Sequence, residues 1–193
     1  MFYFISILFY SFIRALLPKQ KINGWSLESN ITAIFHQGII LPLLLGLYLC
    51  NPDRDKKYIS LLYSTTFAYL FTGLYESFLE LNYIHIAHHS SGLILIGLME
   101  FNQNPSLWWW GAICTATLEI GGLGLSIVDL YPTNINKRFC FWLYGCSRCC
   151  VCIILWNIYC LLPTLISVIC VSIPSLLLVI HNLFVLSQLW VNY

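Results

Sequence analysis

Residues 75–95 read YESFLELNYIHIAHHSSGLIL, and this stretch places five ionisable side chains inside an otherwise apolar segment. They are Glu76, Glu80, His85, His88 and His89. Three of the five histidines in the chain fall within these few residues. Ionisable groups are costly to bury at membrane depth, so they indicate a functional site.

The composition around this stretch is that of a membrane protein. Of 193 residues, 59% are hydrophobic and 9% charged, and the mean hydropathy is +0.78, whereas a soluble domain carries about 25% charged residues. We therefore expect an all-α, multi-pass membrane bundle. The net charge of +1 gives no indication of a nucleic-acid partner. The nine cysteines lie mostly in apolar segments, which argues against a secreted disulfide framework.

Seven segments approach the length of a membrane helix, which is about 20 mostly apolar residues. They are about 2–17, 31–49, 59–79, 83–101, 107–130, 139–160 and 163–190. The break near Leu81 and Asn82 is weak and predicts a tight hairpin of two helices. The junction at Leu162 and Pro163 is also weak, so six spans remain an alternative. The first segment lacks the basic start and cleavage site of a signal peptide, so we expect an uncleaved span.

Alternation of span direction places the polar residues in one half of the bilayer. These residues are His36, Glu76, Glu80, His85, His88, His89, Asp129, Arg148 and His181. Glu119 falls near the middle of its span. Five basic residues flank this side and three flank the other, which predicts that the polar side is cytosolic. The glycosylation sequon at Asn30 is therefore expected to remain unused.

Helical spacing supports a site in this half. Glu76 and Glu80 are four residues apart and share a helix face. His85, His88 and His89 line one side of the next helix. The short link between the helices lets Glu80 approach the histidines, and a carboxylate beside an imidazole suits general acid–base chemistry.

Two other interpretations of the histidines stay open at this point. His85, His88 and His89 form the pattern H-x-x-H-H found in membrane di-iron hydroxylases and desaturases. Those enzymes resemble one another in having about eight ligands, whereas only His36 and His181 remain here. A mononuclear site stays open, because imidazole and carboxylate are ordinary metal ligands, but we expect no metal. Alternatively, the polar groups form a network that holds helices together, at about 0.6–2 kcal/mol per hydrogen bond.

Other motifs have simpler explanations. The run Cys146-Ser-Arg-Cys149-Cys150-Val-Cys152 enters an apolar span. We therefore expect these cysteines to act as small hydrophobic residues or as palmitoylation sites, and not as ligands of a zinc ion. The three tryptophans 108–110 are expected to anchor a helix at the opposite interface. Gly121, Gly122 and Gly124 are expected to permit close helix packing.

The order of these features resembles the TLC domain, the family of ceramide synthases and related lipid-handling membrane proteins. Six short motifs occur in the family's order over about residues 29–190. They are Ser29 to His36, Phe67 to Glu76, the pair His88-His89, Thr117 to Glu119, Phe141 to Arg148, and Asn182 to Trp190.

The resemblance implies a six-helix TLC-like domain over 29–193, preceded by a span and basic loop over 1–28. It also implies an endoplasmic-reticulum-type membrane and a role in lipid metabolism, sensing or composition. Ceramide synthases transfer an acyl group from acyl-CoA to a sphingoid amine. By analogy His88 and His89 would be the base or nucleophile.

The remaining polar residues take supporting roles by the same analogy. Glu76, Glu80 and His85 would assist catalysis. The substrate would be contacted by His36, Glu119, Asp129, Arg148 and His181. The paired aspartates that follow the histidines in the synthases are missing here, since the corresponding stretch holds only Glu100. The chain therefore resembles the non-synthase members more closely.

We expect a multi-pass membrane protein of TLC type that acts on or senses membrane lipids, with His88 and His89 at the polar end of a lipid-sized cavity. One alternative is a ceramide-synthase-like N-acyltransferase with acyl-CoA as co-substrate. Another is a non-catalytic lipid-binding protein. No resident cofactor is expected, and the sequence leaves the oligomeric state open. A metal-dependent lipid oxidase or a transporter has less support, the latter because no inverted repeat is evident.

Overall fold

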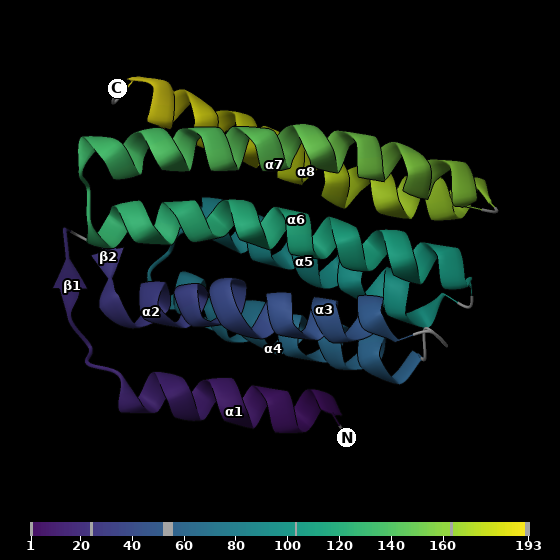
Figure 1. Cartoon of the computed structure of the whole chain (residues 1–193), viewed down its shortest axis with the longest axis horizontal. Helices are drawn as coiled ribbons and strands as arrows, with labels where there is room; N and C mark the ends of the chain where they lie inside the picture. Colours follow the sequence, from purple (N-terminus) through teal and green to yellow (C-terminus); the bar gives the residue numbers. More distant parts are fainter. Residues whose placement is uncertain (1, 24, 52–55, 103, 163, 192–193) are drawn as a thin grey trace.

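The computed structural model describes residues 2–23, 25–51, 56–102, 104–162 and 164–191, and the described chain is almost entirely helical. The helices are α1 (Phe2–Leu16), α2 (Leu27–Phe35), the π-helix η1 (His36–Ile40), α3 (Leu41–Cys50), α4 (Lys56–Leu79), α5 (Tyr83–Phe101), α6 (Pro105–Leu130), α7 (Asn134–Leu161) and α8 (Leu165–Val191). Helices α2, η1 and α3 follow one another without a break (Figure 1). This confirms the predicted all-α class.

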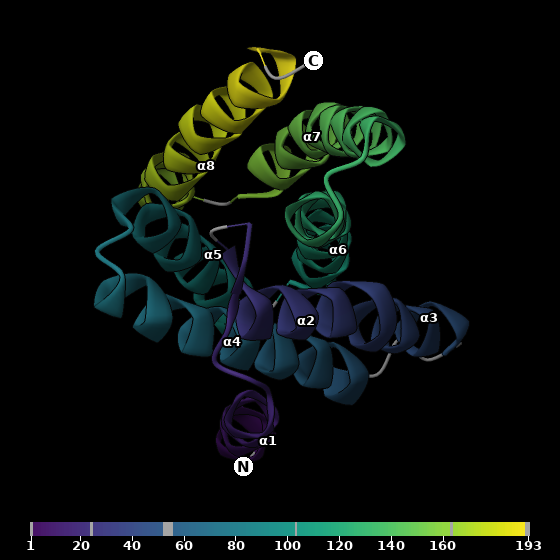
Figure 2. The ribbon, with the colours of Figure 1, turned by 90° about the vertical axis from the view of Figure 1, so that its left-hand side faces the viewer.

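The helices lie side by side and alternate in direction (Figure 1). The view along the bundle shows α1 at one edge against α4, with α2 and α3 beside α4 (Figure 2). Helix α7 packs along α6, and α8 contacts both α5 and α7. The predicted alternation is therefore confirmed, and the ends of α4, α6 and α8 lie at the same end of the bundle as the starts of α2, α5 and α7.

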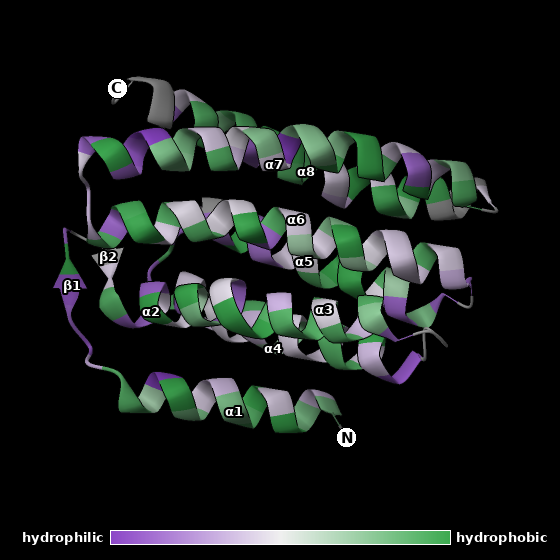
Figure 3. Ribbon diagram, in the orientation of Figure 1, coloured by the Kyte–Doolittle hydropathy of each residue, from purple (hydrophilic) through white to green (hydrophobic). Residues whose placement is uncertain are grey.

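Among the described residues, four helices are long and apolar enough to cross a membrane. They are Leu27–Cys50, Pro105–Leu130, Asn134–Leu161 and Val168–Gln188. Helix α1 is apolar, but its 15 residues extend only about 22 Å, against a hydrocarbon core of about 30 Å. Figure 3 shows hydrophobic residues along the helices and hydrophilic ones at the β1–β2 hairpin. The predicted membrane character thus rests on four helices, and not on all seven expected spans.

Helices α4 and α5 are less apolar because polar residues face the interior. In α4, Ser64, Thr66, Thr72 and Ser77 are buried. Their hydroxyl groups are satisfied partly by helix carbonyls, as where Thr72 Oγ1 donates to Ala68 O at 3.0 Å. Helix α5 carries three histidines in its first two turns. Of these polar residues, Ser77 and the three histidines belong to the candidate site described below.

The basic loop between the first two helices forms a small hairpin that the sequence analysis did not predict. Strand β1 (Lys21–Ile22) pairs antiparallel with β2 (Trp25–Ser26). Asn23 has a φ of 52°, a left-handed conformation that asparagine adopts more readily than most residues. Its Nδ2 donates to the backbone oxygen of Asp129 at 3.2 Å, which fastens the hairpin to the end of α6.

The tight hairpin predicted between α4 and α5 is confirmed. Helix α4 ends at Leu79 and α5 begins at Tyr83. The backbone N–H of Asn82 donates to Ser77 O at 2.9 Å, which closes the end of α4. The side-chain oxygen of Asn82 accepts from the backbone N–H of His85 at 3.2 Å, so it caps α5 and fixes where the histidine-bearing helix begins.

Replacing Leu81 by glycine is expected to stabilise the protein by about 0.5–1 kcal/mol. Leu81 lies in this hairpin with a φ of 54° and an exposed side chain. A left-handed conformation costs an L-residue about 1–2 kcal/mol, which glycine avoids at some cost in entropy. Thermal unfolding in detergent measures the change. Leu79→Gly, in the helix, is the control and should lower the melting temperature; a decrease with Leu81→Gly would refute the prediction.

The continuous helix from Leu27 to Cys50 contains one π-turn, at His36–Ile40. The N–H of Leu41 donates to His36 O, five residues earlier. Pro42 follows in the first turn of α3; its ring lacks an N–H and clashes with the carbonyl four residues before it in an α-helix, which favours the wider turn. Single π-turns often occur at functional sites.

Candidate functional site

Four histidines from α5 and α8 meet at one end of the bundle, and we call His85, His88, His89 and His181 the four-histidine cluster. The ring of His88 stacks on that of His181, with centroids 4.5 Å apart and planes at 29°. His88 and His89 have centroids 5.5 Å apart, and His85 and His89 6.1 Å. The structure therefore brings His181 to the three histidines of the central stretch, as the antiparallel arrangement predicts.

Helix α4 closes one side of the cluster. A Cβ atom on Gly73 would lie 2.8 Å from Cε1 of His89, so only glycine allows α5 to approach here. One turn further on, Ser77 Oγ lies 3.5 Å from Nδ1 of His89. The same hydroxyl donates to Gly73 O at 2.8 Å. Gly73 and Ser77 are site residues that the sequence analysis did not single out.

Helices α6 and α7 support the other side of the cluster. Asn182 Oδ1 lies 3.4 Å from His181 Nδ1 and accepts a hydrogen bond from Tyr144 OH at 2.8 Å. The guanidinium carbon of Arg148 lies 4.1 Å from the centre of the Tyr144 ring. Arg148 Nη1 also donates to Leu118 O at 2.7 Å. The buried Arg148 therefore supports the cluster through Tyr144 and Asn182.

His36 occupies a different place in the interior. Its fully buried ring stacks on Tyr69, with centroids 4.4 Å apart, and its Nδ1 lies 2.5 Å from Tyr10 OH. Tyr10 comes from α1 and Tyr69 from α4. His36 thus joins three helices, and its protein contacts are with the aromatic rings of Tyr10 and Tyr69 around the π-turn.

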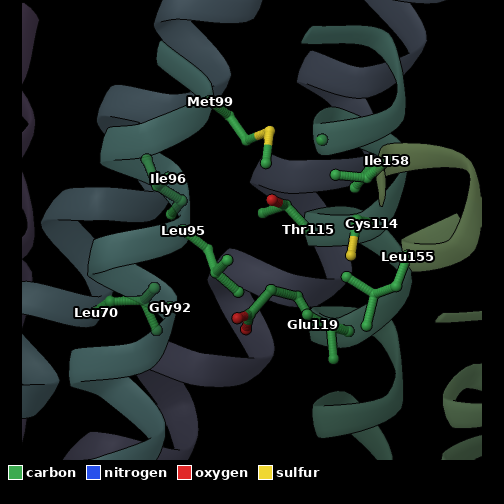
Figure 4. A pocket seen from close by; sticks show the side chains of 12 residues that line it. Leu70, Gly92, Leu95, Ile96, Met99, Cys114, Thr115, Glu119, Leu155 and Ile158 are labelled. Atoms are coloured by element: carbon green, nitrogen blue, oxygen red, sulfur yellow. The ribbon is translucent and has the colours of Figure 1, made fainter. Parts of the chain in front are cut away.

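Glu119 lies deep in the core and is hydrogen-bonded to the π-turn. Gln37 Nε2 donates to Glu119 Oε2 at 2.8 Å and lies 3.3 Å from Tyr69 OH. Glu119 also borders a cavity of about 40 Å³, and Figure 4 shows its carboxyl group extending from α6 toward Leu95. The rest of the lining is mostly apolar.

This cavity differs from the lipid-sized one expected from the sequence. Its volume of about 40 Å³ accommodates about three water molecules and no acyl chain. Its lining includes Leu70, Met99 and Leu155, whose side chains occupy the space between the helices. Neither His88 nor His89 borders it, so a lipid at the four-histidine cluster would have to approach from elsewhere.

The two glutamates expected to assist catalysis both pair with basic residues. Glu76 forms an ion pair with Arg14 and accepts from Ser29 Oγ at 2.5 Å. The exposed Glu80 lies 3.4 Å from Lys21 Nζ in the hairpin and also interacts electrostatically with His85. Helix α1 and the hairpin therefore each supply a cation to one of these carboxylates.

The sequence analysis did not predict that Arg14 pairs with the site residue Glu76. It treated Arg14 only as a basic residue beside a predicted span. Ser6, Tyr10 and Arg14 recur every four residues and are the buried residues of α1. That spacing is the signal that would have found it, because it marks one inward face with a cation at its end. Lys19 similarly pairs with the buried Glu28.

Asp129 does not join the four-histidine cluster. It is half-buried in the last turn of α6, and its backbone oxygen accepts from Asn23. Within the described ranges, no three His, Cys, Asp or Glu side chains are arranged to hold a metal ion. The cysteines Cys146, Cys149, Cys150 and Cys152 are free thiols exposed on α7.

No protein-family model, curated protein or solved structure matches this chain. The functional argument therefore depends on the motifs and on the geometry of the cluster.

Proposed function

We propose that this chain is a multi-pass membrane protein of TLC type that binds a membrane lipid at its four-histidine cluster and either modifies or senses it. The observation that carries the proposal is the Nδ1 atom of His88, which is buried and has no hydrogen-bond partner among the described residues. A buried polar atom without a partner costs about 1–3 kcal/mol. A lipid headgroup that supplies this partner accounts for the cost.

The position of the cluster supports a lipid ligand. His88 lies five residues after the start of α5 at Tyr83, or about 7.5 Å along the helix axis. His88 therefore lies in the second turn of α5, while the outward faces of the helices are rich in apolar side chains such as Trp142 and Trp156. An endoplasmic-reticulum-type membrane is part of this proposal.

A second candidate is a ceramide-synthase-like N-acyltransferase, favoured by the stacking of His88 on His181 next to His89. One imidazole would remove the proton from a sphingoid amine while the acyl group passes from the thioester of acyl-CoA to the nitrogen. The coenzyme A thiolate leaves and takes up the proton. A neighbouring imidazole as nucleophile would carry the acyl group in between.

The test is to purify the protein in mild detergent and identify bound lipids by mass spectrometry. Wild type and the exposed control Asn157→Ala are expected to retain a defined lipid. The double variant His88→Ala/His89→Ala should retain at least tenfold less, as loss of about 1.4 kcal/mol of binding implies. Equal lipid content in all three proteins would contradict a binding role for the cluster.

Incubation of the same proteins with acyl-CoA and a sphingoid base separates the two candidates. An N-acyl product or an acyl-histidine adduct, formed by wild type and the control but not by the double variant, supports the acyltransferase. Lipid retained at the cluster without consumption of acyl-CoA supports a binding or sensing role.

A further inference from the structure

The hydrogen bonds around His181 define which of its nitrogens carries the proton. Nδ1 of His181 lies 3.4 Å from the side-chain oxygen of Asn182. An amide oxygen only accepts hydrogen bonds, so the nitrogen facing it must be the N–H of the ring. In a neutral imidazole, the other nitrogen, Nε2, then carries the lone pair.

The orientation of Asn182 is itself fixed by a second donor. Tyr144 is fully buried, and its hydroxyl donates to Asn182 Oδ1 at 2.8 Å. Arg148 covers the face of the Tyr144 ring at 4.1 Å and is anchored on Leu118 O in α6. The phenol is therefore held against the amide oxygen, so the same oxygen faces both Tyr144 OH and His181 Nδ1.

We propose that Tyr144 and Asn182 are positioning residues that hold His181 in the Nδ1–H tautomer, so that its Nε2 lone pair serves as the base of the four-histidine cluster. The role of His181 as a base depends on the proposed function, which this assignment deepens. The tautomer of His181 is a property of the protein alone. Neither Tyr144 nor Asn182 has a predicted contact with substrate.

A longer contact favours the same tautomer of His89 on the opposite side. Ser77 Oγ donates its proton to Gly73 O at 2.8 Å, so toward His89 it acts as an acceptor. It lies 3.5 Å from His89 Nδ1, which favours N–H at this nitrogen and the lone pair at Nε2. His88 lies between these two oriented rings, 4.5 Å from His181 and 5.5 Å from His89, and its unpartnered nitrogen is the one left for a ligand.

The tautomer is measured directly by nitrogen NMR of protein labelled with ¹⁵N-histidine in detergent micelles, without added lipid. The signals of His181 are assigned by their loss in His181→Gln. We expect the Nδ1–H form in wild type. In Asn182→Leu the ratio of Nδ1–H to Nε2–H should fall by about tenfold, as expected for loss of one buried hydrogen bond.

Tyr144→Phe is the second variant, because it removes one hydroxyl and leaves the packing intact. It frees the amide to rotate, so the ratio should fall in the same direction. Asn157→Leu, on the exposed face of α7, should leave the ratio unchanged. The His36 signal, set by its bond to Tyr10, reports that each variant is folded.

An Nε2–H form of His181 in wild type would overturn the proposal, since it would mean that the amide presents its NH₂ group. An unchanged ratio in both folded variants would overturn it as well. If His181 is Nδ1–H and shifts as expected while no variant binds or turns over lipid, the tautomer assignment stands and the proposed function fails.

Discussion

Replacing Arg14 by methionine is expected to lower the free energy of unfolding by about 3 kcal/mol. The substitution leaves the carboxylate of Glu76 without its cation, and breaking a buried pair in this way costs about 3–5 kcal/mol. The lower end applies because 24% of the Glu76 side chain is exposed, against 8% of Arg14. Ser29 still donates to Glu76 and offsets part of the loss. Thermal unfolding in detergent measures the effect.

The double variant Arg14→Met/Glu76→Gln should recover most of this stability, because it removes the uncompensated charge. The matched control is Lys21→Met, which breaks the pair with Glu80. Those side chains are 65% and 48% exposed and 3.4 Å apart, so the loss should stay below about 1 kcal/mol. Equal losses for Arg14→Met and Lys21→Met would show that the inner pair does not hold α1 against α4.

Replacing Gly121 by leucine is expected to be at least as damaging, at about 3 kcal/mol. A Cβ at this position would lie 2.2 Å from Ser147 Oγ and 3.1 Å from Ser147 Cβ. The hydroxyl cannot move away freely, because it donates to Tyr144 O at 2.8 Å. Helices α6 and α7 would have to separate, and overpacking of this kind costs about 1–3 kcal/mol or more. The expected readout is a lower melting temperature in detergent.

Gly97→Leu is the matched control for Gly121→Leu. No atom lies within 4 Å of a Cβ built on Gly97, and glycine inside a helix costs about 1 kcal/mol relative to a good helix former. The control should therefore raise the melting temperature. A stabilising effect of Gly121→Leu would mean that α6 and α7 pack less closely than described.

The helices follow from the sequence because long apolar segments separated by polar residues have few alternatives. Local signals also place their ends. Pro105 begins α6 after Asn104, whose side chain accepts from the N–H of Ser106 at 2.9 Å, and Thr133 caps α7. The predicted close packing at the glycines of α6 is likewise confirmed, because Gly121 and Gly124 face α7 and Gly122 faces Gln37.

The partners of the charged residues do not follow from the sequence in the same way. Glu76 in α4 pairs with Arg14 in α1, far away in the sequence. This pairing depends on the packing of α1 against α4. The short link between α4 and α5 predicted that Glu80 approaches the histidines, and Glu80 does interact with His85, but the sequence did not predict that the hairpin brings Lys21 to the same carboxylate. Spacing within one helix identifies residues that share a face, whereas the contacts between helices decide which charge meets that face.

The π-turn sets the phase of the helix from Leu27 to Cys50. The buried residues Glu28, Thr32 and His36 repeat every four residues, and the next buried positions of this stripe are Leu41, Leu44 and Tyr48. The step from His36 to Leu41 is five residues, and an extra residue in one turn offsets the helical angle by about 100°. Without that offset, the polar first half and the apolar second half would face different directions. With it, both halves face the same core, so one helix gives the bundle an interior that changes from polar to hydrocarbon along its length.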